Sequence, residues 1–360
     1  MKVAIIGAGV AGLSCALEFE HLGVHADLFE RDCSIGWLWP SVNYWPSIFY
    51  RDMEDIVQYI KTNYNLDLKP LAECKHIVLS SPNKKASIRG KLGHFFVKGK
   101  NADSIEMQIA RELRFTPIHY NHNADYKELS KKYDWVIVAT GSDAIARDLG
   151  IWEEKGLVRS IGGVVVGHFD PHASYLYLNT EYAGTGYARL TPFSSTEAIV
   201  GLYTIGLDEF QSERLFSEFM IKEGLSKLEF IYKILPQPFS TGKLKKYQVD
   251  NILFVGRAAG LTERLLGVGG PAAIVSGMLA ARSIVNGQSY KKLLKPLLFY
   301  TENISSFRNI INKFANDDFD RLIALLGTPG LKQLIYNTDI DFTNNFGRII
   351  KHIPLKPRPR

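Results

Sequence analysis

The sequence predicts an α/β fold in which a parallel sheet is interrupted by an inserted antiparallel sheet and followed by a helical C-terminal segment. Three observations predict it. Short apolar runs that end in glycine occur at residues 2–7, 134–141 and 251–256, as in buried parallel strands. Segments of alternating polarity separate them, which is typical of antiparallel strands. Residues 290–326 have a helical pattern that the Gly-Thr-Pro-Gly sequence at 327–330 ends.

The composition is that of a folded protein without disulfides. Of its 360 residues, 46% are hydrophobic and 22% charged, so a large core can form. The three cysteines, an odd number at irregular spacings, favour reduced thiols and a cytoplasmic location. The most apolar helical stretch, residues 272–285, contains Arg282 and is too short and too charged to span a bilayer. No signal-peptide pattern precedes the first strand.

The charge balance permits anionic ligands but does not favour nucleic acid. A net charge of +6 suits anionic ligands or lipid headgroups. Because no basic stripe with interleaved aromatic residues is present, we expect no nucleic-acid partner. Residues 351–360 are basic and proline-rich. This tail is either solvated or in contact with anionic lipid, which would place the protein peripherally at a membrane.

The first 30 residues form a strand–turn–helix–strand pattern. An apolar run over 2–7 predicts the first strand, an alanine-rich run over 13–22 the helix, and residues 24–29 a second strand that ends at Glu30. The turn before the helix has the sequence Gly-Ala-Gly-Val-Ala-Gly. In this context the pattern predicts a nucleotide-binding unit rather than a plain glycine-rich turn.

Each glycine of this turn has a physical role. Gly7 makes the tight turn, Gly9 lets the backbone approach a pyrophosphate, and Gly12 lets the helix pack closely on the strand. The free N–H groups and the positive dipole at the helix N-terminus favour the phosphates. Glu30, at the end of the second strand, can accept hydrogen bonds from both ribose hydroxyls.

Two distant segments complete the pattern. The strand over residues 134–141 ends in Ala-Thr-Gly, and the strand over 251–256 continues into Gly-Arg-Ala-Ala-Gly. A glycine-rich stretch at Gly267–Gly270 follows, and Pro271 then opens a helix at its favoured first position.

Together, the three segments resemble the glutathione-reductase-type FAD-binding fold over residues 1 to about 290. Within it, they look like the p-hydroxybenzoate hydroxylase branch, and most like the geranylgeranyl reductase family, in which Gly-Asp-Ala-Ala-Gly precedes a glycine-rich loop and a helix. The resemblance implies a discontinuous Rossmann-like FAD-binding domain and hydride transfer at flavin N5. The FAD contacts it implies are Gly7, Gly9, Gly12, Glu30, Arg31, Gly141, Gly256, Arg257, Gly269 and Gly270.

One position departs from the family. Arg257 stands where the family has an aspartate that contacts the ribityl chain. Its guanidinium either pairs with the FAD pyrophosphate or points to solvent. A helix that begins at Pro271 would direct its positive end at the flavin and stabilise the reduced form; alternatively, the glycines only cap it.

The three segments are separated by insertions, so the domains are discontinuous. A second G-x-G-x-x-G is absent, and we therefore expect no separate NAD(P)H domain. In the insertions, strands are predicted at 75–80, 93–97, 163–167, 173–178, 186–191 and 198–205. The predicted domains are an FAD-binding domain (1–74, 101–154 and 246–290), a substrate domain (75–100 and 155–245), and a C-terminal helical segment with a basic tail (291–360).

The segment Gly186–Pro192 aligns with a sheet motif that covers the flavin in the resembling families. Only Tyr187 and Pro192 match it, and Arg189 replaces a tryptophan. This counts against a halogenase and weakens a prenyl-lipid substrate. If Arg189 faces the site, it suits a substrate carboxylate or phosphate; otherwise it faces solvent.

An aromatic stretch follows the second strand. Its side chains either stack on a planar or hydrophobic substrate or form an apolar packing cluster. The substrate-side candidates here are Trp37, Trp39, Tyr44 and Trp45. The histidine pairs His119/His122 and His168/His172 lack a metal-binding helical context, so we expect no metal.

These patterns predict an FAD-dependent oxidoreductase that reduces C=C bonds of a hydrophobic, isoprenoid-like substrate. An external donor (NAD(P)H, ferredoxin or flavodoxin) would supply the electrons. The alternatives are a flavin monooxygenase or oxidase acting on an aromatic or carboxylate substrate, and a non-catalytic flavin electron carrier. The sequence identifies no catalytic acid.

Overall fold

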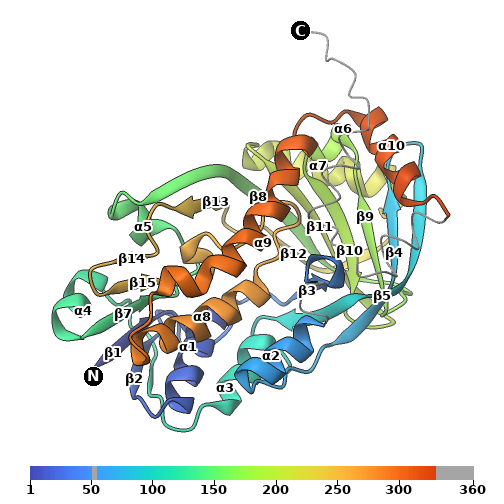
Figure 1. Cartoon of the computed structure of the whole chain (residues 1–360). Coiled ribbons are helices and arrows are strands. Elements are labelled where there is room, and N and C mark those ends of the chain that lie inside the picture. Colours follow the sequence, from blue (N-terminus) through green and yellow to red (C-terminus); the bar gives the residue numbers. More distant parts are fainter. Residues whose placement is uncertain (51–54, 330–360) are drawn as a thin grey trace.

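A computed structural model describes residues 1–50 and 55–329, which form two sheets with helices between and around them (Figure 1). The basic tail over 351–360 lies outside the described residues. No helix within the described part of the chain is long and apolar enough to cross a membrane. The predicted α/β class, with a Rossmann-like sheet, an inserted second sheet and C-terminal helices, is confirmed. The domain boundaries stay a prediction.

The smaller sheet has the strand order β14-β15-β7-β1-β2-β6. All neighbours pair in parallel except β14, which pairs antiparallel with β15. The strands predicted at residues 2–7, 24–29, 134–141 and 251–256 form its middle. The strands are β1 (Val3–Ile6), β2 (Ala26–Phe29), β6 (Ile118–His119), β7 (Trp135–Val138), β14 (Gln248–Val249) and β15 (Ile252–Phe254).

Helix α1 (Val10–His21) is buried from Val10 to Phe19, and α8 (Gly270–Val285) packs along it. A Cβ atom on Gly277 would lie 2.3 Å from the carbonyl oxygen of Ala11, so the two helices approach at backbone distance. The other helices of this half are α2 (Ile56–Tyr64), α3 (Ile105–Glu112), α4 (Tyr126–Lys132), α5 (Ala144–Asp148) and the 3-10 helix η3 (Gly256–Ala259).

The larger sheet has the order β12-β8-β11-β10-β9-β4-β5-β3, and β13 pairs with β8. Both predicted insertions contribute to it, because β4 and β9 pair in parallel. The strands are β3 (Ser41–Pro46), β4 (Ala72–Ser80), β5 (Lys85–Lys98), β8 (Trp152–Val166), β9 (Ala173–Tyr177), β10 (Tyr187–Pro192), β11 (Glu197–Ile205), β12 (Glu229–Ile234) and β13 (Phe239–Leu244).

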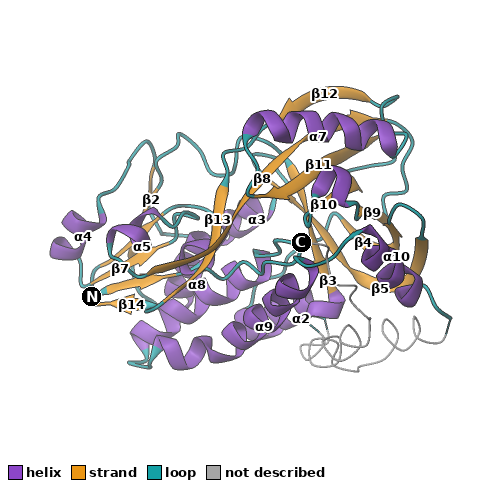
Figure 2. Ribbon diagram, turned by 90° about the horizontal axis from the view of Figure 1, so that it is seen from above, coloured by secondary structure: helices purple, strands orange, loops and turns teal. Residues whose placement is uncertain are grey.

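The outer face of the larger sheet is covered by α7 (Glu209–Lys222), which lies across β8 and β11 (Figure 2). The short α6 (Thr180–Ala183) packs beside it. The inner face turns toward the smaller sheet and the C-terminal helices α9 (Tyr290–Ile311) and α10 (Asn316–Leu326).

The structure differs from the sequence expectations in three places. The second insertion contains the helix α7, whose side chains Leu215, Phe216 and Phe219 are buried at helical spacing. The aromatic stretch contains the strand β3 and the 3-10 helix η1 (Ser47–Phe49). The C-terminal helical pattern is two helices, because α9 ends at Ile311 and α10 begins after the turn that places Phe314 in the core.

Candidate functional site

The turn Gly7–Gly12, called the phosphate turn below, has the geometry that its glycines predict. Gly7 has a φ of +104°, and a Cβ atom there would lie 2.7 Å from the carbonyl oxygen of Ala139, which directly follows β7. A Cβ atom on Gly12 would lie 1.9 Å from the carbonyl oxygen of Gly7. A Cβ atom on Gly9 would meet nothing within 4 Å. Gly7 and Gly12 thus serve packing, while Gly9 leaves space above the turn.

The N-terminus of α1 opens into that space. Gly9 is its N-cap and no side chain caps the helix, so the first N–H groups are available to an anion. Together with the aligned peptide dipoles, they favour a phosphate at this point.

The carboxylate of Glu30 is fixed beside the phosphate turn. One oxygen accepts from the N–H of Ala8 and the other from the N–H of Asp32, both at 2.9 Å. This orientation suits a carboxylate that receives ribose hydroxyls. Arg31 is exposed and lies 3.8 Å from the Asp32 carboxylate, so it can reach a ligand only along the surface.

Tyr120, which the sequence interpretation missed, lies near Glu30. It follows β6, and burial together with the negative charge of Glu30 raises the pKa of its hydroxyl. The N–H of His122 donates to the carbonyl oxygen of Glu30 at 2.8 Å. The pairing of β6 with β2 brings this segment beside Glu30, and no local motif reveals that pairing.

The third segment meets the phosphate turn at Gly256. This residue has a φ of +59°, and a Cβ atom on it would lie 2.9 Å from the Cβ of Ala11. The next side chain, Arg257, is exposed, and its guanidinium lies over the ring of Phe239, 4.5 Å from the centroid. Arg257 therefore begins next to the first turn of α1, where a phosphate would lie. Gly141, with a φ of +65°, follows β7 on the same edge of the sheet.

Residues 261–269, called the flavin loop below, connect η3 to α8. The Glu263 carboxylate, 2% exposed, accepts from the N–H groups of Leu265, Leu266 and Val268. The hydroxyl of Tyr187 donates to the carbonyl oxygen of Leu266 at 2.5 Å. The loop is thus held from within and from the larger sheet.

The glycines at the end of the flavin loop allow close packing. A Cβ atom on Gly269 would lie 2.7 Å from Oγ1 of Thr262, and one on Gly270 would lie 2.6 Å from Nε1 of Trp45. Gly269 is the N-cap of α8, and no side chain caps that helix. A second helix N-terminus therefore has free N–H groups in this half of the molecule.

Tyr187 and Arg189 lie on the inner face of β10. Tyr187 is stacked on Tyr203 of β11, with ring centroids 4.8 Å apart. Arg189 is two residues further along and therefore on the same face. Its Nη2 donates to the carbonyl oxygen of Val42 on β3 at 2.8 Å. The alternative that Arg189 faces the solvent side of the sheet is therefore wrong.

The aromatic candidates divide into two groups. Trp45 is fully buried against Phe96, and Tyr44 is buried with its hydroxyl donating to the carbonyl oxygen of Leu92, so both are core residues. Trp37 is 48% exposed. Trp39 contacts the ring of Tyr232 on β12, with centroids 5.6 Å apart.

The candidate histidines make ordinary contacts. His119 pairs with Asp27 at 3.1 Å, and Nδ1 of His172 lies 2.9 Å from the carbonyl oxygen of Glu73. Across residues 1–50 and 55–329, no group of three or more His, Cys, Asp or Glu side chains is arranged to hold a metal ion.

Comparisons with known proteins agree with this geometry. The sequence model of a family described as pyridine nucleotide-disulphide oxidoreductase matches residues 1–162. No curated protein matches the chain.

Solved structures match nearly the whole chain. A geranylgeranyl bacteriochlorophyll reductase-like protein from Thermoplasma acidophilum has a TM-score of 0.73 at 16% identity, covering 97% of this chain and 98% of the other. A p-nitrophenol 4-monooxygenase from Pseudomonas putida has a TM-score of 0.67 at 13% identity, covering 94% and 96%. A flavin-dependent brominase has a TM-score of 0.64 at 12% identity, covering 98% and 100%. These likenesses show that the fold is that of FAD-dependent oxidoreductases.

The residues present fit FAD. The open space at Gly9, the uncapped N-terminus of α1 and the fixed Glu30 carboxylate suit a pyrophosphate and a ribose. The family match and this geometry together indicate FAD as the cofactor.

Proposed function

We propose that this protein uses FAD to reduce C=C bonds of a hydrophobic, isoprenoid-like substrate, with electrons from NAD(P)H, ferredoxin or flavodoxin. When bound, FAD supplies the hydride chemistry at its isoalloxazine ring. The observation that carries the proposal is the hydrogen bond from Tyr187 to Leu266. It joins the inner face of the larger sheet directly to the flavin loop, so a substrate held by that face would lie at the flavin.

The inner face is suited to an apolar molecule. Tyr187 and Tyr203 are paired across β10 and β11, and the pairing of Val164 with Tyr232 places Tyr232 on the same face. Trp39, in the loop before β3, adds a fourth aromatic ring through its contact with Tyr232. The full-length likeness to the geranylgeranyl reductase-like protein supports the same substrate class.

Arg189 favours a second candidate function, a monooxygenase or oxidase acting on an aromatic or carboxylate substrate. Its guanidinium faces inward, its Nη2 bonds to a backbone carbonyl, and it has no ion pair with a carboxylate among the described residues. An anionic substrate group would complete its pairing.

Anaerobic reduction of the FAD-loaded protein, followed by rapid mixing, tests the proposal. We expect slow reoxidation by air and fast reoxidation by an unsaturated isoprenoid, with the saturated product formed in proportion. Fast reoxidation by air with hydroxylated product or peroxide supports the second candidate instead. Reoxidation only by a carrier protein supports an electron carrier and contradicts both enzymatic functions.

The variant Arg189→Met separates the two enzymatic functions further. It keeps the length and apolar stem of the side chain but removes the charge. Turnover of a neutral isoprenoid should persist in this variant, whereas turnover of a carboxylate substrate should fall through a higher KM. Lys243→Met, a surface charge on β13, is the matched control.

A further inference from the structure

The flavin loop contains one buried charge that the proposed function does not use. Glu263 is 2% exposed, and it is the only acidic residue between Asp250 and Glu302. A carboxylate is buried at such a position only when strong hydrogen bonds or an opposite charge compensate for the loss of water.

The compensation comes from the loop itself. The carboxylate accepts from the N–H of Leu265 at 2.6 Å, of Leu266 at 3.0 Å and of Val268 at 2.6 Å. Two oxygens with several lone pairs are needed to receive three donors from one side. A glutamine at this position has only one acceptor oxygen, and its amide group would face a backbone N–H. The shape of the loop therefore depends on the ionised carboxylate.

The negative charge lies at the N-terminus of α8. Val268, whose N–H it binds, directly precedes the N-cap Gly269. The carboxylate and a flavin at this end of α8 would thus share the same positive helix dipole. A negative charge here opposes the addition of electrons to the flavin.

A buried positive charge lies on α9, the helix that follows α8. Arg308 of α9 is 5% exposed, its Nη2 donates to the carbonyl oxygen of Thr185 at 2.7 Å, and its Nε has no hydrogen-bond partner. Burial raises the pKa of Glu263 and lowers that of Arg308, and each charge partly offsets this effect in the other. The same helix also holds the loop through Ser305, whose hydroxyl accepts from the N–H of Arg264 at 3.1 Å.

We propose that Glu263 is a positioning residue of the flavin site. Its carboxylate fixes the flavin loop, and its charge, opposed by Arg308 of the C-terminal helix, sets how readily the bound flavin accepts electrons. This inference rests on the proposed function only in requiring FAD beside α8.

The test measures FAD affinity and flavin midpoint potential in Glu263→Gln. Loss of one charge-assisted hydrogen bond within the flavin loop should loosen the loop and weaken FAD binding by about tenfold. Loss of the negative charge should make the flavin midpoint potential more positive. In Arg308→Met the sign reverses, and the potential becomes more negative. In Glu263→Asp, which keeps the charge but not the reach, affinity should fall while the potential stays near that of the wild type.

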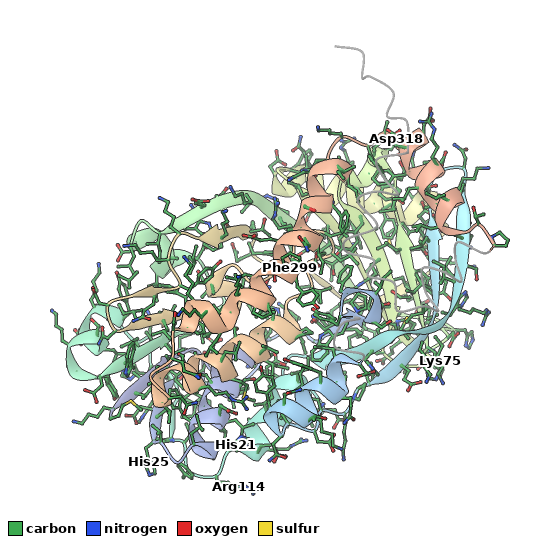
Figure 3. All side chains as sticks on the ribbon, viewed as in Figure 1. His21, His25, Lys75, Arg114, Phe299 and Asp318 are labelled. Carbon is green, nitrogen blue, oxygen red and sulfur yellow. The ribbon has the colours of Figure 1, made fainter. Side chains whose placement is uncertain are left out.

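Asp318→Asn is the matched control. Asp318 is also buried, at 4% exposure, and its carboxylate accepts from the N–H of Ala315 at 3.0 Å. It lies on α10 (Figure 3), away from α8 (Figure 1), so its loss should lower stability but leave the flavin potential unchanged.

The outcomes are distinguishable. A potential in Glu263→Gln equal to that of the wild type and of the control overturns the inference. Shifts of the same sign in Glu263→Gln and Arg308→Met also overturn it, because opposite charges must act oppositely. If Glu263→Gln does not fold, Glu263→Asp and Arg308→Met still decide between charge and shape. Failure of the wild-type protein to bind FAD overturns the proposed function itself.

Discussion

Replacement of Gly9 by alanine separates cofactor binding from folding. The new Cβ would meet no atom of the protein within 4 Å, and the φ of −82° at this position is accessible to alanine. Alanine is a poorer N-cap than glycine, but it also restricts the unfolded chain, and the two effects nearly cancel. We therefore expect the unfolding free energy of the apoprotein to change by less than about 0.5 kcal/mol.

The same methyl group would occupy the space above the phosphate turn. A pyrophosphate there would lose at least one hydrogen bond from the N–H groups of α1. Such charge-assisted bonds contribute about 1.5–3 kcal/mol each, so FAD affinity should fall by about 10- to 150-fold. The decrease follows from the position of Gly9 alone, because no other contact of the protein changes.

Fluorescence titration of the apoprotein with FAD and urea unfolding of the same sample give the two quantities. Gly12→Ala is the comparison variant, since its Cβ would lie 1.9 Å from the carbonyl oxygen of Gly7. That overlap should lower both FAD affinity and the unfolding free energy, the latter by about 1–3 kcal/mol. Unchanged FAD affinity in Gly9→Ala would refute the assignment of the pyrophosphate to this turn.

Three further predictions follow from single contacts. Arg257→Met keeps the apolar stem over Phe239 but removes the charge, so FAD affinity should fall about tenfold and become less sensitive to salt. FAD titrations of both proteins at two salt concentrations check this, and equal affinities of the variant and the wild type mean that Arg257 faces solvent. Tyr187→Phe removes the donor to Leu266 and should lower the unfolding free energy in urea by about 1 kcal/mol; an unchanged value contradicts a contribution from this bond. The hydrogen bond from His94 lowers the pKa of Asp55 to about 2, so the ionised Asp55 carboxylate stabilises the fold fully above about pH 4, and this stabilisation is lost as pH falls toward 2. The unfolding free energy, measured in urea between about pH 5 and pH 3, should therefore depend less on pH in Asp55→Asn than in the wild type. Equal pH dependence in the two proteins contradicts this contribution of Asp55.

The phosphate turn could be predicted in detail because its determinants are local. Tight turn, helix N-terminus and acidic strand end lie within the first 30 residues, and the structure adds only the distances. The fold class followed for the same reason, since each apolar run ends in its own glycine turn. Which of the ten residues expected to contact FAD do so stays a prediction.

The strand β3 in the aromatic stretch was not predicted, because it is buried on both faces. Val42 and Tyr44 pack in the core beside α10, whereas Trp45 packs in the core around α1 and α8. Apolar residues on both faces hide the alternation that identifies a half-buried strand. The helix α7, in contrast, carried a readable signal in the capping pair Asp208 and Gln211, which the strand pattern around it obscured.

Glu263, Tyr120 and Arg308 were missed for a different reason. Each acquires its importance from a partner distant in sequence or from burial, and neither is encoded in a short motif. A single acidic residue in a long apolar and basic stretch was the available signal for Glu263. No comparable signal exists for Arg308, because its distance from the loop depends on how α9 returns across the molecule.

The contacts of the flavin loop suggest how one cofactor fold can support different reactions. The phosphate turn and Glu30 can bind the adenosine diphosphate part of FAD without any contact to the larger sheet. The flavin loop, however, is bonded to Tyr187 of that sheet and to Ser305 of α9. Neither residue belongs to the three segments that are expected to contact FAD. We therefore expect a change in the larger sheet or in α9 to alter the surroundings of a flavin bound at this loop, and to leave the binding of its adenosine end intact. We expect reaction type in this protein to depend on those contacts, and cofactor retention to depend on the N-terminal motif.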